Sequence, residues 1–142
     1  MKLTRNFMLE ELIHTDTGLP NNPTTEEAAK LADLATSLLQ PIRDYWGGLH
    51  VTSGFRSAAV NKKVGGSKTS QHRLGEAADF KPLEFKIDKV YEWIIRDSNL
   101  HFGQCILEKV GSNEWIHISL FRKGKENYVA LTFDGKVYSP YA

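Results

Sequence analysis

The order of helix-like and strand-like patterns along the sequence is the feature that most constrains the fold of this chain. Thr24 and Glu27 have the spacing of a helix capping box, and the residues after them predict a long helix in the first half, which Pro41 should kink or break into two pieces. Residues 102–108, 115–121 and 128–133 read as strands, and Asp134-Gly135 predicts a tight hairpin turn after them. Helices before strands are typical of an α+β fold. We therefore expect a compact domain with a central antiparallel sheet and helices packed on it.

Length and composition narrow the class of protein. With 142 residues, 41% of them hydrophobic and 25% charged, the sequence suggests one soluble domain spanning residues 1–142. The net charge of +1 gives no argument for a nucleic-acid partner. The single cysteine, Cys105, excludes an intrachain disulfide and a cysteine-based zinc site. No apolar run resembles a signal peptide or a membrane span, so we expect a protein that is made in the cytoplasm and not inserted in a membrane. We also expect it to be a monomer.

Residues 70–79 place His72 and Asp79 in one short segment of small residues. Imidazole and carboxylate groups are common zinc ligands, and a catalytic zinc site needs a third ligand and an open position. His117 is the candidate for the third. Spacing alone does not prove the site, because His72 and Asp79 are too far apart for one helical turn. A solvated loop histidine and a turn aspartate remain the alternative.

Glu114 stands three residues before His117 and is a candidate general base. In a regular strand, residues three apart point to opposite faces. Glu114 could act beside His117 only if it preceded the strand or sat at a bulge. A solvated turn glutamate is the simpler interpretation of this residue alone.

Three further residues could contact a substrate. Arg56 follows a predicted strand and Gly54, where it could hold a carboxylate or a carbonyl oxygen, although a surface ion pair is the commoner role of a lone arginine. Ser70 and Gln71 precede His72 and could orient a substrate by hydrogen bonds, or could only shape the turn.

Taken together and in order, these motifs resemble the M15 zinc peptidases of the D-Ala-D-Ala carboxypeptidase type, and most closely their short bacterial and phage members. The resemblance covers most of the chain. Its pieces are residues 7–12, 21–23, 31–43, 53–57, Asn61, 64–66, 70–72, 75–79, 102–104, Glu108 and 115–119.

The resemblance implies a set of roles and a fold. His72, Asp79 and His117 would bind one zinc ion per chain, and Glu114 would be the catalytic acid and base. Arg56 would engage the substrate or the developing oxyanion, and Ser70 and Gln71 would face the substrate. The fold of the family, of the Hedgehog/DD-peptidase type, is a compact α+β domain whose antiparallel sheet holds the zinc.

The resemblance also implies a substrate, the stem peptide of peptidoglycan. Two reactions stay open: removal of terminal D-Ala by a carboxypeptidase, and cleavage of the L-Ala-D-Glu bond by an endopeptidase. Without a signal peptide, an endolysin or virion-associated enzyme of phage origin is favoured. The alternative of another class is a non-catalytic module of the same fold that binds cell wall or forms part of a virion.

Overall fold

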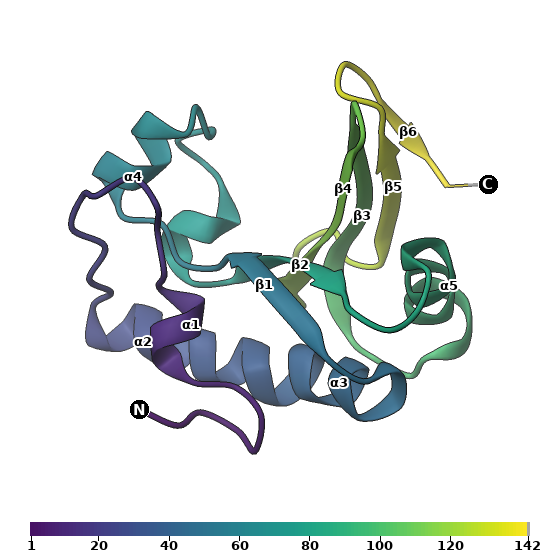
Figure 1. Cartoon of the computed structure of the whole chain (residues 1–142), viewed down its shortest axis with the longest axis horizontal. Helices are drawn as coiled ribbons and strands as arrows, with labels where there is room; N and C mark the ends of the chain where they lie inside the picture. Colours follow the sequence, from purple (N-terminus) through teal and green to yellow (C-terminus); the bar gives the residue numbers. More distant parts are fainter. Residues whose placement is uncertain (142) are drawn as a thin grey trace.

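The computed structural model describes residues 1–141, and its centre is a six-stranded sheet in the order β1-β2-β4-β3-β5-β6 (Figure 1). All neighbouring strands are antiparallel except β3 and β5, which run parallel. The strands are β1 (Leu49–Ser53), β2 (Ala77–Pro82), β3 (Phe102–Val110), β4 (Asn113–Leu120), β5 (Val129–Phe133) and β6 (Tyr138–Pro140).

Short helices and one long helical run complete the fold. The α-helices are α1 (Leu9–Leu12), α2 (Thr25–Leu34), α3 (Gln40–Trp46), α4 (Ala58–Lys63) and α5 (Ile87–Glu92). Three further turns have other helical geometry: η1 (Ala35–Leu39), η2 (Gln71–Leu74) and η3 (Trp93–Asp97). The α+β class expected from the sequence is confirmed. The sheet, however, is mixed and not purely antiparallel, because β5 returns beside β3 in the same direction.

The long helix continues through Pro41 without a break. Thr24 caps α2 and forms the expected reciprocal pair with Glu27. Proline lacks an N–H group and its ring crowds the preceding turn, which usually kinks a helix. Here the π-helical turn η1 lies directly before it, and the Gln40 N–H bonds to the Ala35 carbonyl. This wider turn makes room for the proline ring, and Gly47 then ends the run at a φ of 85°.

The two faces of the sheet have different roles. On β4, Ile116 and Ile118 point into the hydrophobic core, which the buried residues of α2, η1, α3 and α5 share. Their neighbours His117 and Trp115 point to the opposite face, because side chains alternate along a strand. Cys105 of β3 lies on the core face and is fully buried. One face therefore stabilises the domain, while the other is free to carry a site.

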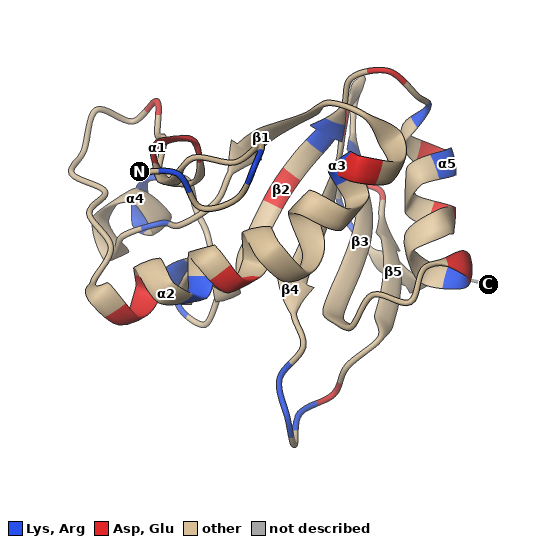
Figure 2. Ribbon diagram, turned by 90° about the horizontal axis from the view of Figure 1, so that it is seen from below, with Lys and Arg blue, Asp and Glu red and all other residues tan. Residues whose placement is uncertain are grey.

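Charge is distributed over the whole molecule. Figure 2 shows basic and acidic residues interspersed along the ribbon, with Lys and Arg on the loop between β4 and β5. Among the described residues, no helix is both long enough and apolar enough to cross a membrane.

Candidate metal centre

The pairing of β2 with β4 brings two of the expected ligands together. Asp79 lies directly opposite His117 in this antiparallel ladder. Directly paired residues point to the same face of a sheet, so both side chains point away from the core. The partners are 38 positions apart in the chain, and only the sheet register unites them.

The third ligand comes from the turn η2, which precedes β2. The Ser70 hydroxyl accepts a hydrogen bond from the His72 N–H at 3.2 Å and caps this turn. Gly75 ends it in the left-handed region, at a φ of 75°. A side chain there would also collide with the Glu27 carbonyl, since an added Cβ would lie 2.6 Å from that oxygen. The glycine thus lets η2 turn sharply into β2 and directs His72 toward Asp79.

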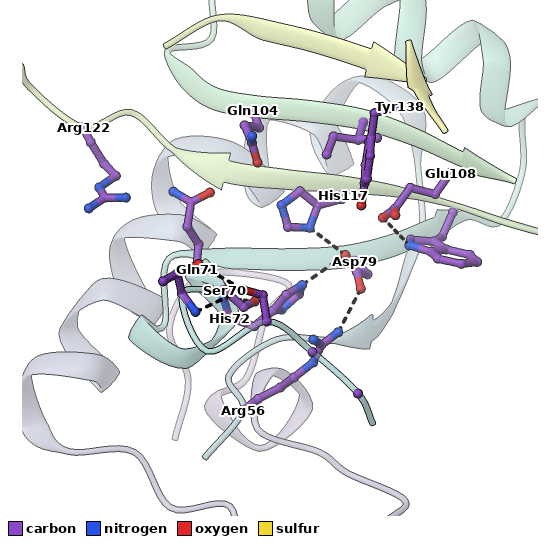
Figure 3. A pocket seen from close by; sticks show the side chains of 16 residues that line it. Arg56, Ser70, Gln71, His72, Asp79, Gln104, Glu108, His117, Arg122 and Tyr138 are labelled. Carbon is purple, nitrogen blue, oxygen red and sulfur yellow. Dashed lines mark hydrogen bonds and ion pairs between the residues drawn. The ribbon is translucent and has the colours of Figure 1, made fainter. Parts of the chain in front are cut away.

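The imidazole rings of His72 and His117 converge on one carboxylate oxygen of Asp79 (Figure 3). Asp79 Oδ1 lies 2.9 Å from His117 Nδ1 and 3.3 Å from His72 Nε2. The other ring nitrogen of His72, Nδ1, lies 2.7 Å from the Gly54 carbonyl oxygen and donates to it. This bond fixes the ring and leaves Nε2 as the free electron-pair donor of the imidazole.

Burial and charge set the protonation of this cluster. Burial lowers the pKa of His72, against the opposing effect of Asp79, and therefore favours the neutral imidazole that can bind a metal. Burial alone would raise the pKa of Asp79, but the neighbouring His72 and His117 more than offset it and lower that pKa. Asp79 therefore stays ionised.

These donors fit a metal ion. One ligand atom from each of His72, Asp79 and His117 lies within 4.8 Å of the other two, and no other such group occurs among residues 1–141. Two imidazole nitrogens and one carboxylate oxygen are a donor set that suits zinc, and three protein ligands leave a position open. The Gly54 carbonyl that orients His72 is a typical outer partner of a metal-binding histidine.

Arg56 is held close to the cluster. Its guanidinium lies 3.5 Å from Asp79 Oδ2, and its Nε donates to the Ser53 hydroxyl at 3.0 Å. The buried amide of Asn21 fixes the surrounding loop, because it donates to the Phe55 carbonyl and accepts from the Ser57 N–H. Arg56 is thus a positioned cation beside the metal ligands and not a mobile surface residue.

A cavity of about 590 Å³ opens above the cluster. The expected site residues Arg56, Ser70 and Gln71 all line it, together with the three ligands. Its other polar and aromatic lining residues are Ser67, Thr69, Gln104, Glu108, Trp115, Arg122 and Tyr138. The site therefore has room for an extended ligand, with its floor on the sheet and one wall on η2.

Glu114 does not lie in this cavity. The sequence analysis required it to precede the strand or to sit at a bulge, and this expectation is wrong. Glu114 belongs to β4 itself and pairs regularly with Lys109 of β3. Alternation therefore directs it to the face opposite His117, where it lies 3.7 Å from the Lys109 ammonium and is about half exposed.

Glu108 is the carboxylate that the fold brings to the cavity instead. It lies on β3 directly opposite Trp115, which is two residues from His117 and on the same face. The Trp115 indole N–H donates to Glu108 Oε2 at 2.8 Å and orients the carboxylate. Burial, followed by the nearby Asp79 charge, raises the pKa of Glu108 above its ordinary value of 4.5. A carboxylate with a raised pKa is well suited to exchange protons.

Sequence reasoning assigned no role to Glu108, Arg122 and Tyr138, which line the cavity. Glu108 was part of the family resemblance, but its position depends on the β3–β4 register, which no local pattern determines. Arg122 follows the end of β4, and Tyr138 lies at the start of β6. Both enter the site through the fold of the C-terminal part, for which the sequence predicted a strand at residues 128–133 and a hairpin turn at Asp134-Gly135 but no place beside the site.

Comparison with known proteins agrees with this geometry. The sequence model of the family described as Peptidase M15 matches residues 1–119. A search of curated proteins found no match. The matched segment covers most of the chain and contains His72, Asp79 and His117, and this family implies metallopeptidase activity. The chain belongs to the M15 peptidase family.

Proposed function

We propose that this protein is a zinc peptidase that hydrolyses peptide bonds in the stem peptide of peptidoglycan. The observation that carries the proposal is the convergence of His72 and His117 on Asp79, at the base of a cavity that also holds an oriented carboxylate, Glu108. Family membership supports the same reaction class. A module that only binds would have no need of a proton-accepting carboxylate beside three metal ligands.

The residues present would hold one zinc ion through His72, Asp79 and His117. Zinc bound there would supply a Lewis acid that polarises the scissile carbonyl and makes a water molecule more acidic. The chain prepares this position before any metal binds. The hydrogen bond from His72 to Gly54 and the contact of Arg56 with Asp79 Oδ2 both hold the ligands in place.

Glu108 then acts as the general base and acid. Its carboxylate accepts the proton of the attacking water and later gives it to the departing amine. Trp115 keeps one carboxylate oxygen, Oε2, engaged and so restricts the rotation of the group. The second oxygen, Oε1, accepts no hydrogen bond from residues 1–141 and is available for the proton.

Arg56, Ser70 and Gln71 form the substrate side of the cavity. Arg56 carries the positive charge nearest to Asp79 and can stabilise negative charge that develops on the substrate oxygen. Ser70 uses its hydroxyl to cap η2, so its main contribution is to hold the wall of the cavity in position. Gln71 offers both a donor and an acceptor to a peptide backbone.

The reaction is either the removal of terminal D-Ala or cleavage of the L-Ala-D-Glu bond. A carboxypeptidase needs a cation for the free terminal carboxylate, and both Arg56 and Arg122 line the cavity. An endopeptidase needs space on both sides of the scissile bond. We propose that the protein acts as a monomer on the bacterial cell wall, as a phage-derived lysis or virion-associated enzyme.

The first experiment measures zinc in the purified protein by elemental analysis, with His117→Ala as the comparison. We expect close to one zinc per chain in the wild type and none in the variant. Digestion of purified muropeptides, with mass measurement of the fragments, then identifies the bond. Loss of one D-Ala indicates the carboxypeptidase, and separation of L-Ala from D-Glu indicates the endopeptidase.

Two results would contradict the proposal. Zinc absent from the wild type after reconstitution would remove the metal from the mechanism. A zinc-loaded protein that binds cell wall and cleaves no muropeptide would instead support the non-catalytic module.

A further inference from the structure

The outer hairpin contributes a residue to the cavity through an unbroken row across the sheet. Glu108 on β3 lies opposite Phe133 on β5, and Phe133 lies opposite Tyr138 on β6. Trp115 on β4 completes this row on the other side of Glu108. Because directly paired residues share a face, the register directs Tyr138 to the cavity side of the sheet. It lines the same cavity as the metal ligands.

The ring of Tyr138 is supported from behind, and its hydroxyl is available. Its ring and that of Phe133 are 4.3 Å apart between centroids and inclined by 30°. Figure 3 shows the ring of Tyr138 descending between His117 and Glu108. Within residues 1–141 the hydroxyl forms no hydrogen bond. Burial and the charges of Glu108 and Asp79 raise the pKa of Tyr138, so the phenol keeps its proton and can donate.

We propose that Tyr138 is a substrate-binding residue whose phenol O–H donates a hydrogen bond to a carbonyl oxygen of the bound peptide, and whose ring forms the wall of the cavity beside Glu108. This inference rests on the proposed peptidase function. A peptide that spans the cavity presents backbone carbonyl groups to its walls. Among the side chains of the row, Tyr138 offers the free donor, since the Trp115 N–H is already bonded to Glu108.

Tyr138 also lies beyond residue 119, where the family match ends. The matched segment supplies the metal ligands and Glu108, while the C-terminal hairpin supplies this contact. Tyr138 is therefore a residue by which this chain sets its own selectivity among stem peptides.

The test compares Tyr138→Phe with Tyr45→Phe in the zinc-loaded full-length protein. Tyr45 undergoes the same chemical change on α3, outside the cavity, where its side chain is largely exposed. Hydrolysis is followed with a synthetic stem pentapeptide that ends in D-Ala-D-Ala and with purified muropeptides. Binding without turnover is measured by calorimetry in Glu108→Gln protein, with and without Tyr138→Phe.

We expect Tyr138→Phe to weaken peptide binding and to lower kcat/KM by about five- to tenfold, the effect of one lost hydrogen bond. Zinc content and thermal unfolding should stay as in the wild type, because the change removes no hydrogen bond of the hydroxyl to residues 1–141. Tyr45→Phe should change none of these quantities.

Equal binding and equal kcat/KM in Tyr138→Phe and wild type would overturn the role of Tyr138 and leave the peptidase function intact. A wild-type protein that neither binds nor cleaves either substrate would overturn the proposed function itself, and the role of Tyr138 with it. The two failures are therefore distinguished by the wild type alone.

Discussion

Two regions of the sheet contribute to one cavity but are held in place by different means. In β2, residues 77–80 are buried, and Asp79 in their midst contacts both histidines and Arg56. The β5–β6 hairpin is half-buried along β5 and exposed along β6. Core packing and charge hold the inner region in place. The hairpin is held by the pairing of β5 with β3 and by contacts such as the hydrogen bond from Tyr91 to β5.

The difference separates two tasks of the site. Metal ligands must keep their mutual geometry within narrow limits, and β2, β4 and the turn η2 hold the three candidate ligands. The hairpin holds none of the three candidate ligands, and it lies outside the segment matched to the family. The charge cluster and the edge hairpin should therefore respond very differently to mutation.

The largest effect is expected from Asp79→Asn in the inner region. The variant keeps the shape of the side chain but removes the charge that His72, His117 and Arg56 share. We expect loss of zinc binding, and a fall of about 3 kcal/mol in the free energy of unfolding of the metal-free protein. Urea unfolding and elemental analysis measure the two. Ser139→Ala on exposed β6 is the control and should leave both unchanged.

Replacing Glu108 or Glu114 by glutamine compares the carboxylates on the two faces of the sheet. Glu108→Gln should keep zinc and lower turnover by about a hundred- to ten-thousandfold, because the proton acceptor of the cavity is removed. Glu114→Gln, on the opposite face, should cleave muropeptides at nearly the wild-type rate. Steady-state hydrolysis of both zinc-loaded variants gives the answer. The reverse ranking would return the role of base to Glu114.

The pH dependence of the reaction should report Glu108. Its pKa is raised above 4.5, and the base must be ionised to accept a proton. The rate constant kcat/KM should therefore fall as the pH is lowered through a value above 4.5, and recover as the pH rises. The profile is recorded at constant zinc occupancy. If the residual activity of Glu108→Gln shows the same acid limb, another group controls it.

The smallest effect is expected from removing the hydrogen bond that joins α5 to strand β5 of the hairpin. The buried Tyr91 of α5 donates from its hydroxyl to the Leu131 carbonyl of β5 at 2.8 Å. Tyr91→Phe should lower stability by about 1 kcal/mol, the usual net contribution of one hydrogen bond. Hydrogen exchange should become faster in β5 and β6 and stay unchanged in β2. Faster exchange throughout the sheet would show that the two regions unfold together.

Local sequence patterns predicted the features that neighbouring residues determine. The capping box at Thr24 and Glu27 formed as expected, because both partners lie in one helical turn. Pro41 did not break its helix, since the π-helical turn before it accommodates the ring. Three residues of that turn, Ala35, Leu38 and Leu39, are buried in the core, and sequence spacing does not reveal such a turn.

For the candidate site, too, the sequence predicted local features and not the contacts between distant residues. The residue types of His72, Asp79 and His117 indicated a metal site, yet their meeting depends on the β2–β4 pairing. Period-two alternation already argued against Glu114. The carboxylate that lines the cavity, Glu108, lies on another strand, and the register of two strands depends on the whole sheet. The parallel return of β5, which delivers Tyr138, is a long-range feature of the same kind.

The reactivity of Cys105, the single cysteine of the chain, can measure how often the strands of this sheet separate. Cys105 is fully buried in β3, between Ile118 of β4 and Ala130 of β5, and burial raises its pKa. A protonated, enclosed thiol reacts with an alkylating reagent only while the strands are apart. The labelling rate of unmodified protein therefore reports the frequency of strand separation, and bound zinc or peptide should slow it in proportion to the opening they suppress.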